Sequence, residues 1–207
     1  MKKLFTLFTV LALILLFPVS CFAETSVGIT ELGFSLSVPD NYDYITRDTE
    51  ESSYVWKKFF IECDAFKEYM EENNIYFVAD SDDYCYEIFI FGKDTEAYKR
   101  VFNLNGYEDE EIIQVFGLIN VEGEELGVEI KDGSVYSSGE TKYYTYIGSY
   151  QLGNHTIYVR DYITIVNGHY IQVDFRSYFD PFSDEMEEYN KAIIDSIEFD
   201  EILKKEG

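Results

Sequence analysis

Residues 143–178 have the sequence YYTYIGSYQLGNHTIYVRDYITIVNGHYIQVDFRSY. Tyrosine and β-branched residues, which favour strands, dominate this stretch. Gly153-Asn154 and Asn167-Gly168 divide it into segments of strand length, and such pairs are typical of hairpin turns. We therefore predict an antiparallel meander of three strands. They span residues 143–150, 156–166 and 170–178.

The register of the second hairpin is predicted from the spacing of its apolar residues. In both strands they occupy odd positions: Ile157, Val159, Ile163, Ile165, Ile171, Val173 and Phe175. A two-residue loop would pair odd with even positions and place the two sets on opposite faces. A three-residue loop, residues 166–168 with Gly168 in the left-handed conformation, pairs odd with odd. We predict the three-residue loop, and direct pairing of Val166 with His169 would contradict it.

Further strands are expected earlier in the chain. Residues 32–38 alternate apolar and small residues before Pro39, as in a half-buried strand, whereas residues 24–30 form a short lead. Residues 75–78 and 84–91 form a strand pair around an acidic turn.

Three helices are predicted. Aromatic residues at three- and four-residue steps indicate a helix from Trp56 to Met70, or a shorter one over residues 65–72 capped by Asp64. A second helix covers residues 108–119, with acidic residues in its first turn. Ser183 caps the last helix, and Phe199 packs behind it. Together these elements predict a single α+β domain over residues 24–207, an antiparallel β-sheet flanked by helices.

The first 23 residues have the three-part build of a secretory signal peptide. Lys2 and Lys3 precede an uncharged apolar run, and Ala23 suits the position before cleavage. We therefore expect the mature protein to be extracytoplasmic. Cys21 supports an alternative fate, in which lipidation of this cysteine anchors the protein on the outer face of the cytoplasmic membrane.

Composition limits the class of partner. The 40 acidic residues outnumber the 16 basic ones, for a formal net charge of -24, and such a surface repels nucleic acid. Basic partners or divalent cations remain compatible with it. The 19 tyrosines indicate a half-buried β framework, with a sugar-stacking surface as the alternative.

Candidate sites are few. Cys63 and Cys85 could form one disulfide, or remain two buried thiols. His155 and His169 flank successive hairpin turns, which lie at opposite ends of a meander, so the two should not share a metal. The sequence has no CxxC motif, GxSxG elbow or P-loop. We therefore expect no catalytic residues and no enzymatic activity.

An acidic turn is the best candidate for a cation site. Asp80, Asp82 and Asp83 could present several oxygens to calcium, although the glycine and distal glutamate of an EF-hand loop are missing. A solvated turn is the alternative, and no other cofactor is predicted. A hydrolase using scattered carboxylates is a third class. It would need a deep pocket lined by carboxyl groups with shifted pKa values.

Three stretches resemble a known fold. Residues 33–39 (GFSLSVP), 163–168 (ITIVNG) and 193–199 (IIDSIEF) are similar to the first strand, the late hairpin and the terminal helix of the PsbP-like fold, named after the extrinsic photosystem protein. The chain also resembles exported, uncharacterised proteins of Gram-positive anaerobes. This resemblance implies an antiparallel sheet flanked by helices and a non-enzymatic binding or accessory role. The family has no catalytic motif that would assign site residues here.

The sequence therefore predicts an exported binding or accessory module that acts on an extracytoplasmic protein partner. The alternative is a calcium- or carbohydrate-binding protein of the cell surface.

Overall fold

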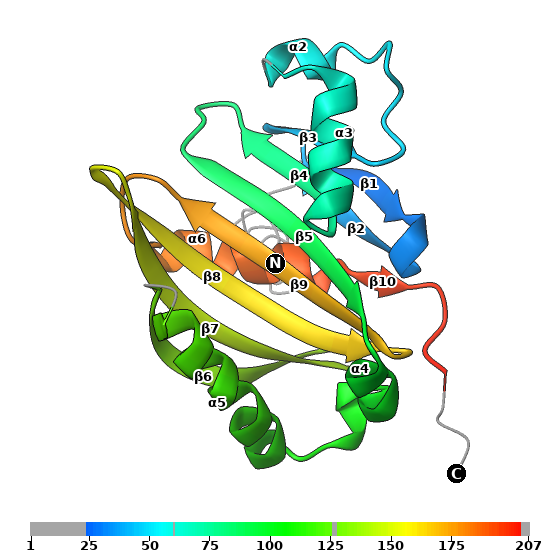
Figure 1. The fold of residues 1–207 in the computed structure, drawn as a ribbon, viewed down its shortest axis with the longest axis vertical. Helices are drawn as coiled ribbons and strands as arrows, with labels where there is room; N and C mark the ends of the chain where they lie inside the picture. Colours follow the sequence, from blue (N-terminus) through cyan, green and yellow to red (C-terminus); the bar gives the residue numbers. More distant parts are fainter. Residues whose placement is uncertain (1–23, 60, 126–127, 204–207) are drawn as a thin grey trace, which may run out of the picture.

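The structure, a computed structural model, describes residues 24–59, 61–125 and 128–203 (Figure 1). The predicted signal peptide, with Cys21, lies outside the described residues. Within the described ranges, no helix is long and apolar enough to cross a membrane.

Two antiparallel sheets organise the fold. The larger has seven strands in the order β3-β4-β5-β9-β8-β7-β6, and the smaller has three in the order β1-β2-β10. The large sheet comprises β3 (Tyr42–Thr46), β4 (Ile75–Ser81), β5 (Tyr86–Asp94), β6 (Glu129–Ser138), β7 (Thr141–Leu152), β8 (His155–Val166) and β9 (His169–Ser177). The small sheet comprises β1 (Glu24–Ile29), β2 (Phe34–Pro39) and β10 (Glu198–Phe199). Residues 24–29, predicted as a lead, are thus a strand.

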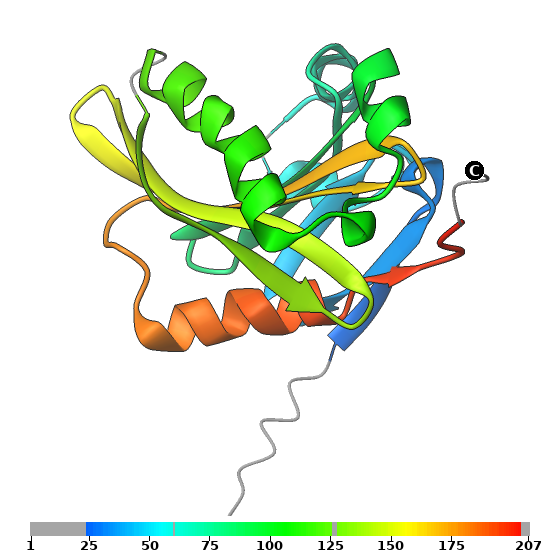
Figure 2. The ribbon, with the colours of Figure 1, turned by 90° about the horizontal axis from the view of Figure 1, so that it is seen from below.

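Helices lie on both faces of the large sheet, as Figure 2 shows. One face, called the helical face here, carries α2 (Val55–Lys58), α3 (Cys63–Glu72), α4 (Glu96–Val101) and α5 (Asp109–Glu125). The opposite face, called the small-sheet face, packs against the small sheet and α6 (Asp184–Asp195). The short 3-10 helices η1 (Thr30–Leu32) and η2 (Leu104–Gly106) complete the described elements. The prediction of an α+β fold with an antiparallel sheet flanked by helices is confirmed.

Three apolar clusters hold these layers together. The largest fills the small-sheet face, where Phe34 and Leu36 of the small sheet meet Val173 of the large one. On the helical face, a second cluster joins α5 to β7 and β8 around Phe116. A third joins α2 and α3 to β3, β4 and β5 around Trp56. Because burial of one large apolar side chain contributes about 1.5–3 kcal/mol, all three clusters stabilise the layered arrangement.

The predicted three-residue hairpin loop is wrong. Val166 pairs directly with His169, and both Asn167 (φ 53°) and Gly168 (φ 83°) adopt left-handed conformations, as a two-residue turn of type I′ requires. The two apolar sets therefore lie on opposite faces. Ile163 packs on the helical face and Ile171 on the small-sheet face. The prediction assumed one buried face, whereas this sheet is buried on both.

The helix predictions are confirmed in part. The stretch from Trp56 to Met70 is not one helix but two, α2 and α3, so the shorter alternative is closer. The N-cap of α3 is Glu62, and Asp64 lies inside its first turn. The second predicted helix corresponds to α5. Ser183 caps α6 as predicted, because its Oγ accepts a hydrogen bond from Met186 N at 3.3 Å. Phe199 packs on Phe34, with ring centroids 5.4 Å apart.

Candidate functional site

A band of polar residues interrupts the apolar helical face of the large sheet. In β8, Asp161 takes a place in the apolar stripe between Val159 and Ile163, and it is 2% exposed. The strand register sets Asp174 of β9 directly opposite Asp161, and Tyr146 of β7 on its other side. Adjacent strands therefore bring two buried carboxyl groups and a phenol into one row.

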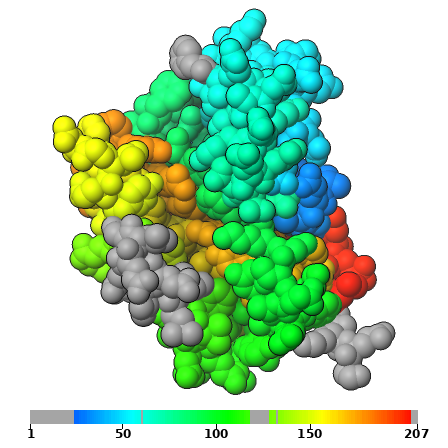
Figure 3. All heavy atoms as spheres, in the orientation of Figure 1, coloured from blue at the N-terminus to red at the C-terminus, as the bar shows by residue number. Residues whose placement is uncertain are grey.

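The helices leave this row partly uncovered. α3 packs over the β3–β5 end of the sheet, and α5 packs over β6 and β7. Between the two helices, strands β8 and β9 reach the molecular surface in Figure 3. The opening has a physical cause, since a helix needs an apolar surface to pack on and these strands present charged groups there.

Two adjoining cavities occupy the opening and share Gln172, Asp174 and Arg176 as their common floor. We call them together the sheet groove. The cavity on the α3 side measures about 310 Å³, and Tyr69 and Lys93 are among its lining residues. The cavity on the β7 side measures about 490 Å³, and its lining is completed by Val128, Tyr146, Tyr150, Gln151, Val159 and Asp161. These volumes suit a small molecule.

Asp174 is held by one basic residue. Its Oδ2 accepts two hydrogen bonds from the Arg176 guanidinium, from Nε at 2.9 Å and from Nη2 at 2.7 Å. The guanidinium also lies over the Phe89 ring, 4.1 Å from its centroid. The other oxygen, Asp174 Oδ1, is buried and has no hydrogen-bond partner among the described residues. Asp174, which lines the floor of the groove, thus has one buried acceptor that is unused among the described residues.

Asp161 has neutral hydrogen-bond partners. Its Oδ1 accepts from Gln172 Nε2 at 2.7 Å, and the Tyr146 hydroxyl also donates to it. Burial, followed by the charge of Asp174, raises the pKa of Asp161 to about 8. The carboxyl group is therefore largely protonated at neutral pH, which limits the cost of burying it.

A second row of charged residues crosses the same face one step along the strands. Arg176, Glu87, Asp80 and Asp43 are consecutive register partners on β9, β5, β4 and β3. Burial and the neighbouring Glu87 raise the pKa of Asp80 to about 7. Tyr178 donates a hydrogen bond to Glu87, and Lys58 forms an ion pair with Asp43. Carboxylates outnumber cations along this row.

The three aspartates predicted to bind calcium lie in different environments. Asp80 belongs to the row just described. Asp83 stabilises the β4–β5 turn, since its Oδ1 accepts from Ser81 Oγ at 2.6 Å and from Cys85 N at 3.1 Å, bonds that lower the pKa of Asp83. Asp82 is exposed in the same turn. Within the described part of the chain, no three His, Cys, Asp or Glu residues converge as a metal site requires.

The other predicted residues lie outside the sheet groove. Cys63 begins α3 and Cys85 precedes β5, and both are free thiols. His155 and His169 are the first residues of β8 and β9 and so lie at opposite ends of the sheet. His169 Nδ1 is 2.6 Å from Asp94 Oδ1.

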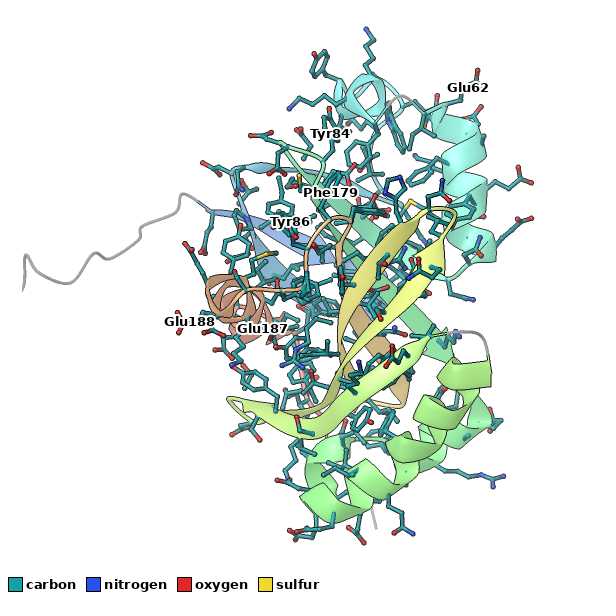
Figure 4. All side chains as sticks on the ribbon, turned by 90° about the vertical axis from the view of Figure 1, so that its left-hand side faces the viewer. Glu62, Tyr84, Tyr86, Phe179, Glu187 and Glu188 are labelled. Atoms are coloured by element: carbon teal, nitrogen blue, oxygen red, sulfur yellow. The ribbon has the colours of Figure 1, made fainter. Side chains whose placement is uncertain are left out.

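A further cavity, of about 570 Å³, lies beside α6. Tyr42 and Tyr189 stack in its wall with ring centroids 6.1 Å apart, and its carboxylates, such as Glu188, are exposed. In Figure 4, Tyr86 and Phe179 lie between Tyr84, which belongs to the β4–β5 turn, and α6. This cavity lacks the buried, facing carboxyl groups of the sheet groove, so the sheet groove is the better candidate site.

Neither Asp161 nor Asp174 was identified from the sequence. A signal for Asp161 exists, because this residue occupies an odd position within the series of Val159, Ile163 and Ile165. A charged residue inside an apolar stripe marks a polar place on a buried face. Asp174 has no comparable signal, because the residues at alternate positions of β9 on the same face are also polar. Only the strand register shows that Asp174 faces Asp161.

The fold is the PsbP-like α+β fold. The chain is similar to the solution structure of cyanobacterial PsbP (CyanoP) from Synechocystis sp. PCC 6803, with a TM-score of 0.51 and 9% identity over 88% of this chain and 96% of that one. It also matches a crystal structure from Bacteroides thetaiotaomicron VPI-5482, with a TM-score of 0.45 and 11% identity, over 85% of this chain and 47% of that chain. At these identities, the similarity concerns the fold alone.

No protein-family model and no curated protein sequence matches the chain.

Proposed function

We propose that this protein is a non-enzymatic binding module of the extracytoplasmic space, and that its ligand binds in the sheet groove. One observation carries the proposal: two facing, buried carboxyl groups, Asp161 and Asp174, line an open cavity of about 490 Å³. The signal peptide that the sequence predicts in residues 1–23 supports the location.

The energetics of the polar band support a binding role. Two facing carboxyl groups in an apolar sheet cost stability, and apolar residues of similar volume would pack there without that cost. Proteins tolerate such groups where they contact a ligand, and binding sites concentrate polar groups with shifted pKa values in concave surfaces. The raised pKa of Asp161 and the unused acceptor of Asp174 have this character.

A thermal-shift screen of the chain from Glu24 onward tests the proposal. The panel contains amino acids, amines, oligosaccharides and calcium, which also covers the alternative of a calcium- or carbohydrate-binding surface protein. A ligand at 100 times its Kd adds about 2.7 kcal/mol, which raises the Tm of a domain of this size by about 5–10 °C.

Two matched variants locate the ligand. Tyr150→Ala removes an aromatic wall of the groove, and Tyr84→Ala removes an exposed tyrosine outside it. We expect the shift to disappear in Tyr150→Ala and to persist in Tyr84→Ala. A panel without any stabilising compound, or a shift that survives Tyr150→Ala, would overturn the proposal.

The accessory role with a protein partner is part of the same proposal. Cross-linking of the tagged protein on native cells, followed by identification of what co-purifies, tests it. One dominant extracytoplasmic protein supports the role, and retention by cell wall alone contradicts it.

One observation favours a second candidate, a hydrolase. Asp161, with its pKa raised to about 8, stands opposite Asp174, which the Arg176 guanidinium binds. Two carboxyl groups in unequal environments can act as acid and base. Hydrolysis of a panel of glycoside, ester and peptide substrates, lost in Asp161→Asn, would support this candidate. Equal turnover by the wild type and Asp161→Asn would exclude Asp161 as the acid or the base.

A further inference from the structure

The chemistry of the sheet groove indicates the class of its ligand. This inference rests on the proposed function, since it concerns the same site. The side chain of Asp174 is 7% exposed and forms part of the floor of both cavities. Its Oδ2 is saturated by Arg176, whereas its buried Oδ1 has no donor among the described residues. A buried carboxylate oxygen without a donor destabilises the folded protein, and a ligand that brings an N–H group would remove that cost.

The charge at the floor of the groove determines whether a cationic or an anionic ligand is favoured. When both are ionised, the two facing carboxylates, Asp161 and Asp174, carry one more charge than the Arg176 guanidinium balances. Glu87 and Asp80 continue the row next to Arg176 and add further negative charge. An anionic ligand would be repelled by this floor, and a cation would be attracted.

The residues that line the walls determine which cavity the ligand prefers and which kind of carbon skeleton, here called its body, fits there. On the α3 side, Lys93 lines the cavity, and its charge would repel a cationic ligand. On the β7 side, Tyr146 and Tyr150 provide aromatic surface, and Val128 and Val159 provide apolar surface. An ammonium beside tyrosine rings gains cation–π attraction, and an apolar body gains burial. The β7-side cavity therefore suits an ammonium carried on an apolar or aromatic body.

We propose that the sheet groove binds a small organic amine, with its primary ammonium between Asp161 and Asp174 and its apolar body against Tyr146 and Tyr150. Binding requires the Asp174 side chain to rotate, because its Oδ1 is buried in the free protein. The ammonium then donates to this oxygen and to Asp161. When Asp161 ionises, the ammonium supplies the positive charge that this second carboxylate lacks, since Arg176 already balances Asp174.

Binding is coupled to proton release. Burial and Asp174 raise the pKa of Asp161 to about 8, so Asp161 is largely protonated in the free protein at pH 7. A cation beside it favours the carboxylate, so the amine displaces up to one proton. The titratable and charged groups around Asp161 come from β7 and β9, and from β5 at the edge of the groove: Tyr146, Tyr150, Tyr170, Asp174, Arg176 and Glu87.

Three probes with one common body test the charge preference by isothermal titration of the chain from Glu24 onward. They are phenethylamine, 2-phenylethanol and phenylacetate, which differ in charge at one position. We expect phenethylamine to bind at least about tenfold more tightly than either of the others. At pH 7, titrations in two buffers with different ionisation enthalpies should show proton release, which should decline above pH 8.

Variants of the floor complete the test. Asp161→Asn should weaken phenethylamine binding at least about tenfold and abolish proton release. Because Asp174→Asn leaves Arg176 buried without its partner, the double variant Asp174→Asn/Arg176→Gln is used at that position. Asp180→Asn, an exposed change outside the groove, should leave the affinity unchanged. Circular dichroism and thermal unfolding confirm that each variant is folded.

The outcomes separate this inference from the proposed function. If a neutral sugar or 2-phenylethanol binds in the groove as tightly as the amine, the binding function stands and the amine inference fails. The inference also fails if phenethylamine does not bind, or if Asp161→Asn retains full affinity. If no compound in the wider panel binds either, the proposed function fails with it.

Discussion

Asp161 and Asp174 face each other across β8 and β9, yet their surroundings are unequal. Arg176 donates two hydrogen bonds to Asp174, whereas Gln172 and Tyr146 give Asp161 neutral partners. A charge on Asp161 is therefore uncompensated, and a charge on Asp174 is paired. Removal of each carboxylate should have opposite effects on stability.

Asp161→Asn should stabilise the protein at alkaline pH. The folded-state pKa of about 8 lies above the usual value of 3.8, so the folded chain holds a proton that the unfolded chain has released. Between these two values, stability falls as pH rises. An amide avoids this loss, and we expect a gain of about 2–5 kcal/mol at pH 8 and little gain at pH 4. Urea unfolding at both pH values measures it.

The control for this prediction is Asp180→Asn, because Asp180 is an exposed aspartate. It should change the free energy of unfolding by less than about 0.5 kcal/mol at either pH. Equal effects of the two variants would contradict the buried, raised-pKa state of Asp161.

Asp174→Asn should destabilise the protein. The change removes the charged partner of the Arg176 guanidinium, which is largely buried over the Phe89 ring. Breaking a buried ion pair from one side costs about 3–5 kcal/mol. The double variant Asp174→Asn/Arg176→Gln removes both charges and should recover part of the loss. A double variant less stable than Asp174→Asn would show that the ion pair is not the cause.

At the scale of elements, the β8–β9 hairpin joins the large sheet to α4. Gly168 N donates to Phe102 O at 2.8 Å, and Asn167 N donates to Asn103 Oδ1 at 2.6 Å. Gly168 has a left-handed φ of 83°, and a Cβ there would lie 3.2 Å from Lys99 Cα. The tight turn and the close approach of α4 thus both favour glycine.

Gly168→Ala should therefore cost more stability than Gly153→Ala. Both glycines are left-handed, but a Cβ at Gly153 (φ 62°) would meet nothing within 4 Å. The backbone strain common to both costs about 1–2 kcal/mol. We expect an additional cost of about 1 kcal/mol at Gly168 from the contact with α4. Chemical denaturation of the two variants measures the difference, and equal losses would rule out the contact.

At the scale of the whole molecule, acidity and buried carboxyl groups act in the same direction. The chain carries a formal net charge of -24, and such self-repulsion destabilises a compact state. Asp161 and Asp80, with pKa values raised to about 8 and about 7, add proton-linked destabilisation as pH rises. The protein should therefore be more stable in mildly acidic than in mildly alkaline solution.

We expect the Tm to fall between pH 5 and pH 8, and to rise on addition of NaCl at pH 8 because salt screens the repulsion. The double variant Asp80→Asn/Asp161→Asn should reduce the pH dependence and leave the salt dependence. Differential scanning calorimetry of the wild type and of the double variant measures these effects. A wild-type Tm that is flat or rising over this pH range would contradict the raised pKa values.

The sequence predicted the strands of the meander and the cap of α6, because these depend on local chemistry. Tyrosine and β-branched residues favour extended chain, and Ser183 supplies its own capping oxygen. The sequence missed β1 and did not divide the Trp56–Met70 stretch into α2 and α3, because pairing with β2 and packing of the aromatic cluster determine those elements. It missed the sheet groove for a similar reason, since Asp161 and Asp174 meet only through the strand register.

The fold class, the acidic character and the strands of the late meander follow from the sequence, because they depend on composition and on hydrophobic periodicity along the chain. Which faces are buried depends on how the sheets and helices pack. With cover on both faces, a two-residue turn sends Ile163 and Ile171 to opposite sides, which local pattern alone could not choose. The same register places Asp161 against Asp174, so the candidate site exists only where separate strands meet.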